Sequence, residues 1–174
     1  MLQLTFSQNL LHETNNTFVV ANSLEELKGL PQSNIDAAAK MAEQQGQAGK
    51  WMFNMQRPSC NPVLQYCENR ELREKVYKAY YNRGNQDNEY DNKAISAKLV
   101  ALRLEKAKLM GYKNYAEMAL EDRMAKTPEN VQNFLAELLD ASLPYAHKEV
   151  ETVLDFAKKN GFEGKELMPW DFSF

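Results

Sequence analysis

The sequence predicts a mainly α fold with a minor two-stranded β element, on three observations. Apolar residues along most of the chain recur at the spacing of amphipathic helices. Most of these helical segments begin at a capping Ser, Thr or Asn, and several end at a glycine. Only residues 17–21 and 50–55 form short runs rich in β-branched or aromatic side chains, which favours strands.

The first half of the chain is predicted to hold short helices around these two strands. Apolar spacing predicts a first helix over residues 6–15. The later helix starts are a capping box of Ser23 with Glu26, a second cap at Ser33 with Asp36, Asn61 followed by Pro62, and Asn69. Because two short strands are not stable alone, we expect them to pack on these helices.

The second half is predicted to consist of longer helices. One of them precedes Gly111, which suits the left-handed residue that follows a helix end. A short helix over residues 114–120 comes next, and Thr127 then caps a long one. Pro144 is expected to kink this last helix without ending it, because the apolar pattern continues beyond it. The apolar residues that define the two long helices are Ile95, Leu99, Leu102 and Leu109, and then Val131, Phe134, Leu135, Leu138 and Leu139.

Composition and charge limit the classes of partner that the chain is expected to bind. Its 174 residues are 44% hydrophobic and 26% charged, with a net charge of -3. This balance gives no electrostatic basis for binding nucleic acid. No apolar run approaches the roughly 20 residues that cross a bilayer, so no membrane partner is expected. Cys60 and Cys67 match no zinc-ligand spacing, and we expect them to be ordinary thiols.

Residues 12–16 begin like a zinc-peptidase motif. That motif places two histidines one helical turn apart, with a glutamate between them as general base. His12 and Glu13 fit, but Asn16 stands where the second histidine belongs, and asparagine is a poor zinc ligand. These residues are therefore interpreted as a polar helix face. The other histidine, His147, is expected to form only a surface pair with Glu151.

Two further segments have a functional and a structural interpretation. Residues 85–91 alternate oxygen-bearing side chains as a calcium loop does, but Asn92 and Lys98 stand where its glycine and final glutamate are needed. A polar loop that caps the next helix is preferred. A group of tyrosines can line a peptide-binding wall or pack helices together, and packing is preferred. The group consists of Tyr66, Tyr77, Tyr80 and Tyr81.

The remaining motif search excludes several enzyme classes. The sequence has no glycine-rich phosphate loop and no nucleophile elbow. Carboxylates on the predicted helices stand beside basic residues, as Glu105 does beside Lys106, which is typical of solvated pairs. From the residues alone we therefore predict no catalytic, cofactor-binding or metal-binding residue in this chain.

An ordered series of stretches covers nearly the whole chain and resembles a known family. The most specific stretch is Leu102–Ala116, with the sequence LRLEKAKLMGYKNYA. The others are Leu27–Pro31, Phe53–Ser59, Glu68–Arg73, Tyr77–Tyr80, Arg83–Asn85, Met124–Val131 and Pro169–Asp171. Together they resemble the thimet-oligopeptidase-like zinc metallopeptidases, especially the bacterial peptidyl-dipeptidase (dipeptidyl carboxypeptidase) branch.

The resemblance implies a large, mainly helical, cytoplasmic peptidase whose two halves enclose a channel. Its zinc would be held by an H-E-x-x-H helix and a later glutamate, well downstream of the region seen here. Zinc is thus implied for the parent enzyme, whereas no cofactor and no site residue can be carried onto this segment. Residues 1–174 are expected to form one helical region, an internal fragment that precedes the catalytic half. Within it, Arg103 is expected to be a buried hydrogen-bond hub.

The resulting hypothesis is a structural helical portion of a zinc-dependent peptidyl-dipeptidase or oligopeptidase that hydrolyses short peptides. The segment alone would not be an enzyme; it would form part of the substrate-channel wall, next to the missing catalytic half. A free-standing helical protein-interaction module without catalysis is the alternative, and an inactive relative of the peptidase stays open as well. An excised segment should expose the apolar residues Trp170–Phe174 and so favour self-association.

Overall fold

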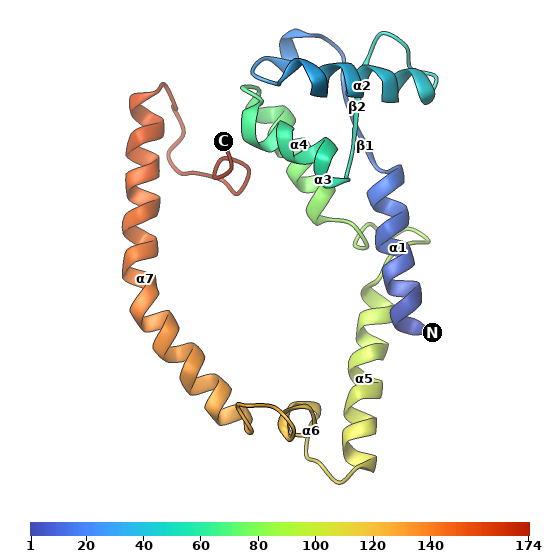
Figure 1. The fold of residues 1–174 in the computed structure, drawn as a ribbon, viewed down its shortest axis with the longest axis vertical. Coiled ribbons are helices and arrows are strands. Elements are labelled where there is room, and N and C mark those ends of the chain that lie inside the picture. Colours follow the sequence, from blue (N-terminus) through green and yellow to red (C-terminus); the bar gives the residue numbers. More distant parts are fainter. The chain divides into compact units, whose positions relative to one another are not determined.

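The computed structural model describes residues 1–174 and confirms the predicted fold class, with helices dominant and a sheet of two strands. Figure 1 shows the elements in chain order. They are α1 (Leu2–Asn16), β1 (Phe18–Ala21), the 3-10 turn η1 (Glu25–Leu27), α2 (Gln32–Gln44), β2 (Trp51–Asn54), α3 (Arg57–Tyr66), α4 (Arg70–Tyr81), α5 (Lys93–Leu109), α6 (Tyr115–Leu120) and α7 (Pro128–Lys159).

The chain forms two compact units. Unit 1 comprises Met1–Ile95 together with Leu167–Phe174, and unit 2 comprises Ser96–Glu166. The chain leaves unit 1 near the start of α5 and returns to it at Leu167. Residues that are far apart in the sequence therefore meet inside unit 1.

The small sheet of unit 1 is held between helices. β1 and β2 pair antiparallel, with Phe18 opposite Asn54 and Ala21 opposite Trp51. In the sequence α2 separates the two strands, and in space it packs on β2. α3 also contacts β2, and α4 contacts β1. The strands thus pack on helices, as expected for a sheet too small to be stable alone.

The apolar core lies where the sheet meets α2, α3 and α4. Its buried residues are Val19, Ala21, Leu27, Leu30, Ala38, Phe53, Met55, Cys60, Val63, Cys67, Leu72 and Val76. Cys60 and Cys67 are free thiols, and burial raises the pKa of both. Because the thiolate is the reactive form, these cysteines are inert packing residues, which confirms their interpretation as ordinary thiols.

Two of the predicted helix starts are wrong. α2 begins at Gln32, directly after Pro31, so Ser33 lies inside its first turn and does not cap it. α3 begins at Arg57, and Asn61 and Pro62 lie inside this helix. The reason is Pro58, which occupies the first turn of α3, where a missing N–H removes no intrahelical hydrogen bond.

The caps predicted at Asn69 and Thr127 are confirmed, whereas Ser23 is not the cap of η1, whose N-cap residue is Leu24. The Asn69 side chain accepts a hydrogen bond from Leu72 N–H, Asn114 accepts one from Glu117 N–H, and Thr127 accepts one from Asn130 N–H. After α5, Gly111 adopts the expected left-handed conformation, with φ of 88°. α7 continues through Pro144, as predicted, and Figure 1 shows it as one bent helix.

Unit 2 leaves most of its apolar residues uncovered. In α7 the predicted stripe is present, but four of its members are each at least 50% exposed: Phe134, Leu135, Leu138 and Leu139. In the part of α5 that belongs to unit 2, only Ala107 is buried. The prediction that Arg103 is a buried hub is wrong, because Arg103 is exposed and its guanidinium lies 5.3 Å from the Tyr115 ring centroid. The apolar periodicity is therefore real, but unit 2 does not bury it.

Candidate functional site

The zinc-like residues of α1 are used for packing. The His12 ring stacks on Tyr90 at 3.7 Å between centroids, and the Asn16 side chain donates to the His12 carbonyl of its own helix. No group of three or more His, Cys, Asp or Glu side chains in residues 1–174 is placed to hold a metal ion. Because a catalytic zinc needs three protein ligands, the residues present do not fit that metal.

Glu13 has a buried structural position instead. Only 3% of its surface is exposed, and its carboxylate accepts hydrogen bonds from Gly84 N–H and from the Asn88 side chain. The buried Asn92 amide reinforces the same contact, because it donates to the Phe6 carbonyl and accepts from the Asn9 side chain, both at 3.0 Å. These bonds tie α1 to the loop that precedes α5.

Replacing Glu13 by alanine is expected to lower the free energy of unfolding of unit 1 by about 2–4 kcal/mol, since the buried Gly84 N–H loses a charged acceptor. The unit contains both tryptophans, Trp51 and Trp170, so urea unfolding followed by tryptophan fluorescence reports on it. Glu43→Ala is the matched control, because Glu43 is an exposed helical glutamate. Equal effects of the two changes would contradict the assigned role of Glu13.

The loop of residues 85–91, whose sequence is similar to a calcium loop, binds the ammonium group of Lys93. The Lys93 ammonium lies 2.8 Å from Asp87 and 2.6 Å from Asp91. Asp91 also accepts the Lys93 N–H at 2.8 Å, and its contacts with Lys93 lower its pKa to about 2. The preferred interpretation, a polar loop that caps the next helix, is therefore confirmed.

Two sequence candidates remain, the pair of His147 with Glu151 and the group of four tyrosines, and the fold brings only some of these residues into contact. His147 and Glu151 are exposed on α7 and form neither a hydrogen bond nor an ion pair. The tyrosines of α4 do pack on one another: the Tyr77 ring lies 4.3 Å from Tyr81, and Tyr80 lies 5.3 Å from Tyr81. Tyr66, at the end of α3, is 51% exposed and forms no ring contact.

A buried ion cluster anchors residues 167–174 on α4. Asp171 accepts hydrogen bonds from Arg70 Nε at 3.0 Å and from an Arg73 terminal nitrogen at 3.1 Å. Arg73 also donates to three backbone carbonyls, those of Cys67, Glu68 and Trp170. The side chains of Arg73 and Asp171 are only 5% and 4% exposed. The sequence did not predict this pairing, because 98 positions separate the two residues.

The same cluster changes the expectation for the end of the sequence. Trp170 was expected to be exposed, but only 7% of its surface is, because it packs against Tyr77 with 6.0 Å between ring centroids. Phe172 and Phe174 are exposed, as expected, at 51% and 60%. The ion cluster explains why Trp170 is buried while Phe172 and Phe174 are exposed. Asp171, the residue next to Trp170, is bound to Arg70 and Arg73 of α4.

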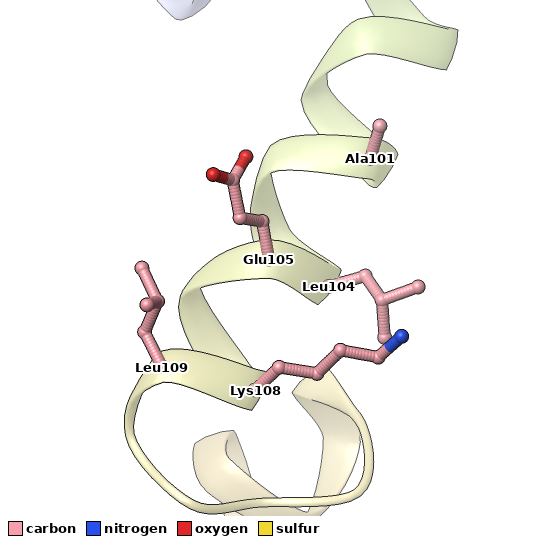
Figure 2. A pocket seen from close by; sticks show the side chains of 5 residues that line it. All are labelled: Ala101, Leu104, Glu105, Lys108 and Leu109. Atoms are coloured by element: carbon pink, nitrogen blue, oxygen red, sulfur yellow. The ribbon is translucent and has the colours of Figure 1, made fainter.

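A separate groove lies on α5 in unit 2. Figure 2 shows Leu104 and Lys108 projecting to one side of the helix and Glu105 and Leu109 to the other. Ala101, one turn earlier, also lines the groove. All of the lining comes from one helix, and its only ionisable groups are one carboxylate and one ammonium. This surface resembles one on which another helix packs, and it holds no catalytic arrangement.

Comparison with known proteins shows the family to which this chain belongs. The sequence profile of Peptidase family M3 matches residues 63–174, which is more than half of the chain. The chain belongs to Peptidase family M3. Oligopeptidase A of Haemophilus influenzae is 37% identical to it over 173 residues, and the probable cytosolic oligopeptidase A of Arabidopsis thaliana is 38% identical over 176 residues. The dipeptidyl carboxypeptidase of Escherichia coli is 33% identical over 172 residues.

Each of these alignments covers 97% of this chain but only 25% of the relative. The chain therefore spans about a quarter of the length of the M3 relatives that it matches. M3 peptidases are zinc metalloproteases, and the predicted resemblance to oligopeptidases and dipeptidyl carboxypeptidases is confirmed. None of the helices combines the length and the apolar character that a membrane span requires.

Proposed function

We propose that this chain is a helical portion of a zinc-dependent M3 peptidase that hydrolyses short peptides as an oligopeptidase or peptidyl-dipeptidase. Residues 1–174 precede the catalytic half in this proposal and form part of the substrate-channel wall. The chain supplies no zinc ligand and no general base, and it acts in the cytoplasm. The free-standing interaction module is the alternative that the experiment below separates from it.

The exposed apolar stripe of α7 carries this proposal. Phe134, Leu135, Leu138 and Leu139 stand at helical spacing on α7, which packs against the short α6 in unit 2. Large apolar patches on soluble proteins mark surfaces that other protein covers. The alignments cover only 25% of each relative. In this proposal, the part of the protein that corresponds to the remaining three quarters covers the apolar stripe of α7.

The proposal predicts that the 174-residue chain alone does not hydrolyse a fluorogenic short peptide above background when zinc is added. The coding sequence after the Phe174 codon is expected to contain H-E-x-x-H and a later glutamate codon. The product of the longer reading frame is expected to cleave the peptide, and a zinc chelator should abolish this cleavage, because zinc polarises the carbonyl and activates the water in such enzymes.

The control is the longer product with the motif glutamate changed to glutamine, which should bind zinc and yet remain inactive. A stop codon directly after the Phe174 codon would refute the proposal in favour of the free-standing module. Zinc-dependent hydrolysis by the 174-residue chain would refute it equally, because this chain would then hold a metal site of its own.

A further inference from the structure

Unit 1 contains a polar pocket of about 230 Å³ that the zinc chemistry of the proposed function does not use. It is lined by Arg57, Asn61, Leu64 and Gln65 of α3, by Tyr80 and Tyr81 at the end of α4, and by Ser173. The α3 residues stand four, seven and eight positions after Arg57, so they form one face of the helix. All of these elements belong to unit 1.

The polar lining is made of hydrogen-bond donors and contains no carboxylate. It offers one guanidinium, two carboxamides, two phenols and a hydroxyl. The Asn61 oxygen already accepts the Cys60 thiol at 3.7 Å, which leaves the NH2 group of Asn61 free to donate. A site with these groups favours a ligand that is negatively charged and accepts several hydrogen bonds.

Arg57 supplies the charge of this pocket. The other nearby arginines are engaged elsewhere, because Arg70 and Arg73 both bind Asp171. Arg83 donates to the Tyr80 carbonyl at 2.7 Å and to Thr14, and lies 3.8 Å from the Tyr80 ring centroid. Arg57 is exposed and has no acidic partner.

Two arginines, Arg57 and Arg83, affect the phenol of Tyr80. A hydrogen bond from Arg57 lowers the pKa of Tyr80, and Arg83 lowers it further. Arg57 and Tyr80 both line the pocket, and a phenol hydroxyl can donate a hydrogen bond as well as accept one. The guanidinium and the phenol are thus two donors of the same pocket.

We propose that this pocket binds the free carboxyl terminus of a peptide. The planar guanidinium fork of Arg57 matches a carboxylate, the neutral donors take its remaining lone pairs, and Leu64 contacts the apolar part of the terminal residue. A water molecule occupies about 30 Å³, so the volume suits one terminal residue and excludes a folded partner. The choice of a peptide rests on the proposed function, whereas the preference for an anion rests on the pocket alone.

The test is a titration of the isotope-labelled 174-residue chain, followed by nuclear magnetic resonance of the Arg57 Nε–H and of the side-chain amides of Asn61 and Gln65. The probes are acetyl-Ala-Leu with a free carboxylate, the same dipeptide as its amide, and inorganic phosphate. The free acid is expected to shift these signals and to bind at least about tenfold more tightly than the amide, because one charged hydrogen-bond pair is lost in the amide.

Two variants test the assignment to Arg57. Arg57→Gln should weaken binding of the free acid by about tenfold or more and remove the difference between acid and amide. Gln65→Glu places a carboxylate in the same pocket and should weaken the acid likewise without changing side-chain length. Lys75→Gln is the control, since it removes one positive charge from an exposed position of α4 that does not line the pocket, and it should bind as the wild type does.

Equal binding of acid and amide, or unchanged binding to Arg57→Gln, would overturn the site and leave the proposed peptidase role intact. Binding of phosphate without binding of the dipeptide acid would overturn the peptide assignment. If the acid binds as described while the longer reading frame lacks peptidase activity, the carboxylate site stands and the proposed function fails.

Discussion

Replacing Asp171 by alanine is expected to lower the free energy of unfolding of unit 1 by about 3–5 kcal/mol, because a buried arginine loses its counter-charge. Asp171 and Arg73 are both nearly inaccessible, and Asp171 also accepts the Met168 N–H at 2.9 Å. Urea unfolding followed by tryptophan fluorescence measures the change, and Trp170 itself should become more exposed to an added quencher such as acrylamide.

The arginine partners provide a graded comparison. Arg73→Ala should cost more stability than Arg70→Ala, because the Arg70 side chain is 41% exposed and that of Arg73 is 5% exposed. Asp36→Ala is the control: this exposed aspartate accepts one bond from Gln32, and its loss should cost about 0.5 kcal/mol or less. Similar losses for Asp171→Ala and Asp36→Ala would contradict the anchoring role of the cluster.

The ion cluster also gives the stability of unit 1 a defined dependence on pH. Burial by itself would raise the pKa of Asp171, but hydrogen bonds from Arg70, from Met168 N–H and from Arg73 outweigh it and hold the pKa below its ordinary value of 3.8. The folded state therefore binds fewer protons than the unfolded state in this range. The contribution of Asp171 is fully present above the ordinary value and is lost as the pH falls through the folded-state pKa. Asp171→Asn should lack this part of the acid-induced loss.

Replacing Gly29 by alanine is expected to destabilise unit 1 by roughly 3 kcal/mol or more, through backbone strain and a steric clash together. Gly29 has φ of 90°, and a Cβ atom there would lie 2.1 Å from the Tyr66 carbonyl oxygen. The contact cannot relax at a flexible side-chain end, because that oxygen is backbone and the adjoining Lys28 carbonyl accepts Glu68 N–H at 2.8 Å. The same fluorescence-detected unfolding measures the loss.

Gly46→Ala separates the two causes. Gly46 also has positive φ, 72°, but nothing lies within 4 Å of a Cβ placed there. Its replacement should cost about 1–2 kcal/mol from backbone conformation alone. If the Gly29 and Gly46 variants lose the same stability, the close approach of the chain at Gly29 contributes nothing.

Local sequence signals predicted the elements well where the determining contact is short-range. Asn69, Asn114 and Thr127 each accept a hydrogen bond from the residue three positions on, so each cap can be recognised within four residues. The start of α3 was predicted wrongly because the local signal there is ambiguous. Two prolines, Pro58 and Pro62, each fit a first turn, and only packing determines which one occupies it.

The apolar stripe of α7 shows a second limit of prediction from the sequence. Periodicity correctly predicted the helix and the face on which Phe134, Leu138 and the other apolar residues stand. It does not say what covers that face, because a helix buried by its own domain and one buried by further protein have the same pattern. The exposed position of Arg103 is an error of the same kind, since burial depends on neighbours that a helix does not encode.

The sequence by itself determined the helical class, the two strands, most caps and membership of a peptidase family, because these depend on periodicity, short-range hydrogen bonds and ordered motifs. Only the tertiary structure decided which distant polar groups meet. Glu13 binds the backbone of Gly84, 71 positions away, and Arg73 binds Asp171, 98 positions away. The Arg57 pocket likewise needs α3, α4 and Ser173 together. Such pairings follow from how the chain returns on itself within unit 1, and no local pattern in the sequence records that path.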